Sequence, residues 1–148
     1  VVAELAAYYR SRGLTLADGI EEIYKEYGYY AEKTISVTLS GVDGAEQIKA
    51  IMAKFRNNAP KEWNATEITV VEDFKAQTST TADGTVTALT TPPSDVLKYT
   101  LADGSWIAVR PSGTEPKIKF YIAVVGESNE DSQAKIANIE AEINAFVK

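Results

Sequence analysis

Two strand-like runs and a short polar turn between them make up residues 106–121, which read Trp106-Ile107-Ala108-Val109-Arg110-Pro111-Ser112-Gly113-Thr114-Glu115-Pro116-Lys117-Ile118-Lys119-Phe120-Tyr121. In the first run Trp106 and Ala108 alternate with Ile107 and Val109, which is the period of a strand with two different faces. The second run begins at Lys117 and continues to Val125. The pattern predicts two strands that end and begin at one charged turn.

The turn carries groups that bind anions. Arg110 offers a fork of N–H donors, and Ser112 and Thr114 offer hydroxyl groups. Gly113 has no side chain, so its backbone N–H can come close to an anion. These residues suit a dianionic phosphate. The alternative is an ordinary tight turn in which Arg110 pairs with Glu115, and the residue chemistry alone leaves both possibilities open.

Composition describes an ordinary globular domain. The chain has 148 residues, of which 45% are hydrophobic and 24% charged, as in soluble proteins with one well-buried core. No apolar run is long enough to span a bilayer, so we expect no membrane partner. The first residues lack a start methionine and the features of a secretion signal. We therefore expect the chain to be a piece of a longer protein.

Two residue types are missing altogether. The chain has no cysteine and no histidine, which excludes disulfides, thiolate or imidazole metal sites and Ser-His or Cys-His nucleophile pairs within it. The absence of cysteine fits a reducing compartment, and we expect a cytoplasmic protein. The net charge of -6 argues against nucleic-acid binding, which needs a basic surface. The cations near Arg110 therefore favour a small anion over a polyanion.

The first forty residues read as two short helices and an extended segment. Residues 1–12 resemble the end of a helix that stops at Gly13, and Thr15 with Asp18 resembles a capping box at the start of a second helix. Helices this short cannot bury their apolar faces alone, so we expect them to belong to a preceding domain. Residues 33–39 alternate like an extended connector or an edge strand.

The remaining residues predict an α+β domain. A helix with a core-facing stripe begins near Gly44, and a last helix follows a cap at Ser128. Strands are expected at 67–74, 95–102, 105–110 and 117–125, with a hairpin turn at Asp103-Gly104. The threonine-rich residues 75–94 are expected to form a surface loop or loose hairpin. The prediction is an antiparallel sheet of about four strands with two helices on one face.

The segment 106–121 resembles the C-terminal phosphate-binding loop of the phosphoglucomutase/phosphomannomutase family, the α-D-phosphohexomutases. The run Ser94-Asp95-Val96-Leu97-Lys98-Tyr99 and the run Asp103-Gly104-Ser105-Trp106 resemble the approach to that loop in bacterial phosphoglucomutases. The similarity is close from Ser94 to Gly126 and looser back to the first helices. It implies a TATA-binding-protein-like C-terminal domain over residues 41–148, with residues 1–40 holding helices of the third domain and the interdomain connector.

The resemblance also implies site residues. The family's loop holds the substrate phosphate that stays on the sugar during the reaction. By resemblance, the residues that hold it here are Arg110, Ser112, Gly113, Thr114 and Lys119. Lys119 stands where many relatives have arginine, so it would act as a point charge without a forked donor pair. The implied ligands are glucose 1-phosphate, glucose 6-phosphate and the bisphosphorylated intermediate, and the implied partners are other domains of the same chain.

No catalytic residue and no metal ligand is expected in this chain. The resemblance implies a phosphoserine loop, an aspartate-rich magnesium loop and a sugar-recognition loop in earlier domains, and no such runs occur here. We therefore expect Mg²⁺ in the full-length isomerase, an intramolecular phosphotransferase, and no catalysis by this segment alone. A swing of the domain about the connector at 33–40 is a further expectation. The rival hypothesis is a non-enzymatic protein-interaction module with the same fold.

Overall fold

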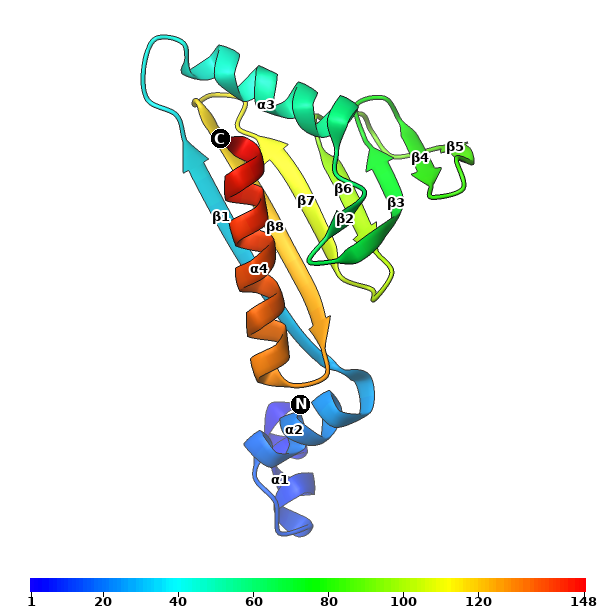
Figure 1. Ribbon diagram of the computed structural model, residues 1–148. Coiled ribbons are helices and arrows are strands. Elements are labelled where there is room, and N and C mark those ends of the chain that lie inside the picture. Colours follow the sequence, from blue (N-terminus) through cyan, green and yellow to red (C-terminus); the bar gives the residue numbers. More distant parts are fainter.

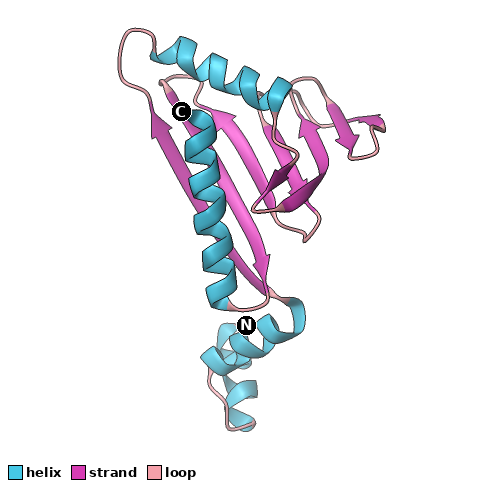
Figure 2. Cartoon of the chain, viewed as in Figure 1, coloured by secondary structure: helices cyan, strands magenta, loops and turns pink.

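A computed structural model describes all residues from Val1 to Lys148. The chain forms four helices and one antiparallel sheet (Figures 1 and 2). The helices are α1 (Val2–Ser11), α2 (Leu16–Tyr27), α3 (Gly44–Asn58) and α4 (Asn129–Val147). The strands are β1 (Tyr29–Thr38), β2 (Glu62–Trp63), β3 (Thr66–Asp73), β4 (Thr78–Thr81), β5 (Val86–Ala88), β6 (Leu97–Leu101), β7 (Trp106–Pro111) and β8 (Lys117–Gly126).

The sheet has eight strands instead of the four or so that were predicted. Seven follow the order β1-β8-β7-β6-β3-β4-β5, and β2 pairs with β3 outside this path. The threonine-rich segment supplies β4 and β5 as a hairpin at one edge. These two strands lie at the surface with no buried side chain, so they lack the apolar alternation by which a strand is recognised from sequence. The α+β class, the antiparallel sheet and the main helices are as predicted.

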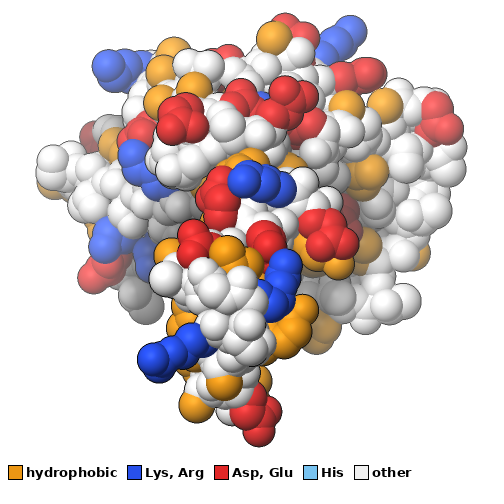
Figure 3. Space-filling view, turned by 90° about the horizontal axis from the view of Figure 1, so that it is seen from below, with side chains coloured by type: hydrophobic (Ala, Val, Ile, Leu, Met, Phe, Trp, Pro, Cys, Tyr) orange, Lys and Arg blue, Asp and Glu red, His pale blue; other side chains and the backbone are white.

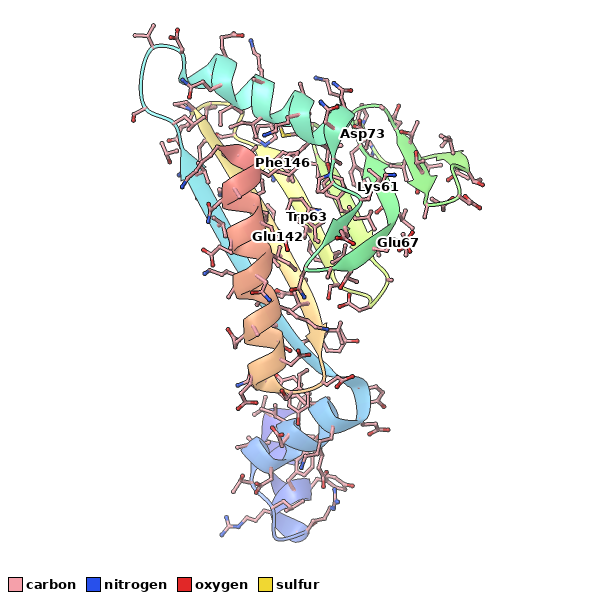
Figure 4. The ribbon with its side chains drawn as sticks, viewed as in Figure 1. Lys61, Trp63, Glu67, Asp73, Glu142 and Phe146 are labelled. Atoms are coloured by element: carbon pink, nitrogen blue, oxygen red, sulfur yellow. The ribbon has the colours of Figure 1, made fainter.

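The core lies between one face of the sheet and the helices α3 and α4. Its buried side chains come from alternate strand positions and from the helix stripes, and include Phe55 of α3 and Phe120 of β8. Trp63 of β2 and Phe146 of α4 lie toward each other near the end of this core (Figure 4), with their ring centroids 6.1 Å apart. Because both helices cover the same face, the opposite face of the central strands has no helix over it.

Strand β1 settles the reading of residues 33–39. It is an edge strand that pairs with β8 from Tyr29↔Gly126 to Thr38↔Lys117, which is one of the two possibilities that the alternation allowed. This pairing ties β1 to the sheet of the following residues and removes the basis for a domain swing within residues 33–38. The division of the chain at residue 40 stays a prediction.

The first two helices lie at one end of the molecule, beyond the ends of β1 and β8 (Figure 1). The capping box is present as predicted, since Thr15 and Asp18 exchange hydrogen bonds. The view onto this end shows apolar side chains among charged ones (Figure 3). Exposed residues here include Leu5, Ile20 and Ile23. None of the helices has the length and apolar character needed to cross a bilayer.

Candidate anion-binding site

Arg110 and Lys119 lie side by side on the open face of the sheet. They are direct partners in the antiparallel pairing of β7 with β8. Their neighbours Val109 and Phe120 are fully buried under the helices, so alternation places Arg110 and Lys119 on the other face. Arg110 is exposed and Lys119 half-buried. Two cations from adjacent strands therefore meet where β7 runs into the loop.

The loop from Ser112 to Pro116 is ordered by its own hydrogen bonds. The backbone N–H of Ser112 donates to the carbonyl of Lys117 at 2.7 Å. The Ser112 hydroxyl oxygen accepts from the backbone N–H groups of Thr114 and Glu115, at 3.4 and 3.3 Å. With its oxygen used as an acceptor, the Ser112 hydroxyl keeps its own proton to donate to an anion.

The far end of the loop is fixed against the start of α3. The backbone N–H of Leu39 donates to the carbonyl of Pro116 at 2.9 Å. A Cβ on Gly44 would lie 2.7 Å from the Leu39 carbonyl oxygen and 2.9 Å from the Pro116 Cβ. Only glycine allows α3 to begin so close to these two residues. The position of the loop thus depends on a contact with a distant part of the sequence.

A hollow of about 300 Å³ opens beside the loop. All five residues proposed from the sequence line it, together with one that sequence reasoning missed: Arg110, Ser112, Gly113, Thr114, Lys119 and Tyr121. Tyr121 follows Lys119 by two positions in an alternating strand, and this spacing is the signal that could have identified it. The structure therefore brings the predicted residues together around one concave surface.

The cations that face the hollow have no carboxylate partners. Neither Arg110 nor Lys119 takes part in a salt bridge within 4.0 Å, whereas Lys117 lies 3.7 Å from Glu115. The alternative in which Arg110 pairs with Glu115 is therefore wrong. The regular register of β8 places Lys117 on the same face as Lys119, and its nearby carboxylate partly compensates its charge. Two positive charges remain free to meet an anion.

The acidic side chains of the chain are dispersed. No group of three or more histidine, cysteine, aspartate or glutamate side chains is arranged to hold a metal ion. Magnesium prefers several oxygen ligands in octahedral geometry, and the residues of this chain do not fit that requirement. The candidate site is lined by hydrogen-bond donors and two cations.

Comparison with known proteins identifies relatives. The model of the family described as phosphoglucomutase/phosphomannomutase, C-terminal domain, matches residues 37–145. A phosphoglucomutase of Staphylococcus aureus (strain bovine RF122 / ET3-1) is 36% identical over 137 residues, covering 92% of this chain and 25% of that protein. A phosphoglucomutase of Staphylococcus haemolyticus is 33% identical over 139 residues, covering 93% of this chain and 25% of that protein. The chain thus spans about a quarter of the length of these relatives.

A similar fold occurs in a solved structure. The crystal structure of the exocytosis-sensitive phosphoprotein pp63/parafusin, a phosphoglucomutase from Paramecium in its open form, matches with a TM-score of 0.55. The match covers 90% of this chain and 22% of that chain at 15% sequence identity. At this identity the likeness concerns the fold.

Proposed function

The chain belongs to the phosphoglucomutase/phosphomannomutase family, of which it contains the C-terminal domain, and on this premise we propose that it is the substrate-phosphate-binding part of a phosphohexomutase. The full enzyme would be an isomerase that interconverts hexose 1-phosphate and hexose 6-phosphate, with glucose as the sugar. The observation that carries the proposal is the pair Arg110 and Lys119, which face a hollow without a carboxylate partner. Family membership does not favour a non-enzymatic interaction module.

Each residue of the proposed clamp has its own part. Arg110 donates a forked pair of hydrogen bonds to two phosphate oxygens, and Lys119 supplies a second positive charge. Ser112 and Thr114 donate from their hydroxyl groups. Gly113 lets the backbone come close to the ligand. A few such charge-assisted bonds, at about 1.5–3 kcal/mol each, give the clamp alone an affinity on the order of millimolar.

Binding a phosphate in place of a sugar suits a mutase. The sugar must turn round between two phosphoryl transfers, so the residues that hold it must accept either phosphate in turn. A clamp for a tetrahedral dianion does this because it makes no demand on the sugar ring. The chemical step itself is assigned to residues outside this chain, including a phosphoserine and bound Mg²⁺, and the chain alone would not catalyse the reaction.

The other parts of the enzyme would meet the chain at its first two helices. Their exposed apolar side chains, including Leu5, Ile20, Ile23 and Tyr27, give a surface of the kind that packs against a neighbouring domain. We place the enzyme in the cytoplasm, which fits a chain without cysteine.

The proposal is tested by NMR titration of the chain with glucose 1-phosphate and glucose 6-phosphate. Amide shifts centred on residues 110–114 are expected with both ligands, and Arg110→Ala is expected to abolish them. Lys33→Ala is a matched control, because Lys33 pairs with Glu140 on the helix side of β1 at 2.5 Å. The expected dissociation constant is on the order of millimolar. If no amide shifts appear at ligand concentrations of roughly tens of millimolar, the proposed function is contradicted.

A further inference from the structure

Tyr121 lines the hollow without belonging to the loop or to the pair of cations. It lies on β8 two positions beyond Lys119, and it shares the open face with Lys119 because Phe120 and Ile122 on either side are buried. The rise along a strand places it roughly 6.6 Å from Lys119. A phosphate held by the two cations would therefore lie beside the Tyr121 side chain.

Tyr121 is half-buried, and its direct neighbours on the adjacent strands are small or exposed. Its partner on β7 is Ala108, which carries only a methyl group, and its partner on β1 is Thr34. Thr34 is exposed, as is Ser36, the β1 partner of Lys119. The direct cross-strand neighbours of Tyr121 and Lys119 on this face are therefore a methyl group and hydroxyl groups, and Trp106 and Lys98 lie farther along the same face.

The phenol group of Tyr121 has no partner in the protein. Its hydroxyl makes no hydrogen bond, unlike that of Tyr29, which donates to Glu21 at 2.6 Å, or that of Tyr99, which donates to the Phe55 carbonyl at 2.8 Å. Its ring lies in none of the aromatic pairs or cation–ring contacts of the molecule. A tyrosine with both its ring and its hydroxyl free can serve a ligand that has an apolar face and polar edges.

We infer that Tyr121 contacts the organic part of a phosphate ester whose phosphate is held by Arg110 and Lys119. A hexose fits this position, because its ring C–H groups can pack on the aromatic face and its hydroxyl groups can hydrogen-bond to the phenol. The contact makes Tyr121 a specificity-determining residue that favours a sugar phosphate over free phosphate. This inference rests on the proposed function, since the phosphate must first occupy the clamp.

The test compares two ligands on three proteins. Dissociation constants for inorganic phosphate and for glucose 6-phosphate are measured by NMR for the unchanged chain, Tyr121→Ala and Tyr121→Phe. Tyr121→Ala is expected to weaken the binding of glucose 6-phosphate about five-fold, in line with the loss of one aromatic contact. The affinity for inorganic phosphate is expected to stay unchanged. Tyr121→Phe keeps the ring and is expected to lose less affinity for glucose 6-phosphate than Tyr121→Ala. Amide spectra check that each variant is folded.

The remaining outcomes overturn the inference in different ways. If Tyr121→Ala weakens both ligands equally, the phenol contacts the phosphate and not the sugar. If the variant binds both ligands as the unchanged chain does, Tyr121 has no part in recognition. The proposed phosphate clamp is not contradicted by that result. If the unchanged chain binds neither ligand, the proposed function fails and the inference fails with it.

Discussion

Arg110 and Lys119 are cross-strand partners that carry the same charge, with no carboxylate within salt-bridge distance of either. Like charges directly opposite each other on a sheet are destabilising. They persist here on a chain whose net charge is -6, where acidic side chains are plentiful. An anion between them would turn the repulsion into two attractions, so we interpret the pair as a binding site that costs the free protein some stability.

Removing one of these charges should therefore stabilise the free chain. We expect Arg110→Gln and Lys119→Gln each to raise the free energy of unfolding by about 0.2–1 kcal/mol, measured by urea denaturation at low ionic strength. The control is Lys98→Gln, because Lys98 lies on the same open face but has Glu72 at 3.9 Å and the Trp106 ring at 5.1 Å. It should give no gain. A loss of stability in both clamp variants would contradict the interpretation.

A substitution at Gly113 should affect ligand binding without affecting stability. A Cβ at this position would meet no atom within 4 Å, and its backbone is not in the left-handed region. Gly113→Ala should leave the free energy of unfolding unchanged within about 0.5 kcal/mol. It should weaken binding of glucose 6-phosphate several-fold, because the methyl group keeps the anion away from the backbone N–H. Unchanged affinity would show that the anion does not approach Gly113.

Gly44 should influence the site without touching the ligand. In Gly44→Ala the new Cβ collides with the Leu39 carbonyl and with Pro116, so the loop or the start of α3 must move. Overpacking of this kind costs about 1–3 kcal/mol. We expect lower stability, shifted amide resonances for residues 112–116 and weaker phosphate binding. Full affinity together with unchanged loop resonances would show that this contact does not position the loop.

The turn between β2 and β3 contains a correctable strain. Asn64 and Ala65 form a two-residue turn with φ values of 50° and 52°, and alanine in this region is unfavourable by roughly 1–2 kcal/mol. Ala65 is exposed, so Ala65→Gly loses no buried contact and should raise the free energy of unfolding by about 1 kcal/mol. Ala82→Gly, at an exposed position without positive φ, is the control and should not stabilise.

Asp73 should make stability depend on pH below neutrality. Its side chain lies beneath the end of α3 (Figure 4), where Arg56 Nε donates to it at 2.7 Å and the backbone N–H groups of Lys75 and Ala76 also donate. Burial raises the pKa of Asp73, but these hydrogen bonds outweigh burial and lower the pKa below its ordinary value.

The direction of the effect follows from this lowered pKa. A carboxyl group whose pKa is lower in the folded state stabilises the protein above the pKa it has when unfolded, near pH 4. That stability is lost as the pH falls through the folded pKa. Asp73→Asn should cost about 2 kcal/mol at pH 7 and should flatten the acid side of the stability profile. An acid profile identical in slope to that of the unchanged chain would exclude Asp73 as its source.

The sequence predicted those features that depend on local chemistry. The capping box of Thr15 and Asp18, the apolar stripe of α3 and the turn at Asp103-Gly104 each leave a distinct pattern, and each is present. The five proposed site residues surround one hollow because β7, the loop and β8 are continuous in sequence. Most of the candidate site could therefore be predicted from the sequence, because its residues lie close together along the chain.

Other features depend on contacts that leave no pattern in the sequence. Strands β4 and β5 are held by an exposed hairpin and not by an apolar face, so no periodicity marked them. Glu115 lies 3.7 Å from Lys117 and forms no ion pair with Arg110, a choice between two nearby cations that no sequence pattern marks. The contact of Gly44 with Pro116 joins residues far apart in the chain. Tyr121 is uncharged and lies within a regular strand outside the polar turn, so its residue type alone did not mark it as part of the site.

The most direct test of the proposed phosphate clamp is the unfolding free energy of the unchanged chain and of Arg110→Gln as glucose 6-phosphate is added at constant ionic strength. We predict that the variant is the more stable protein without ligand and that the order reverses with it. The unchanged chain should gain about 1.4 kcal/mol at ten times its dissociation constant, and the variant should gain almost nothing. Equal gains for the two proteins, or no gain for either, would contradict the claim that Arg110 is part of a phosphate receptor.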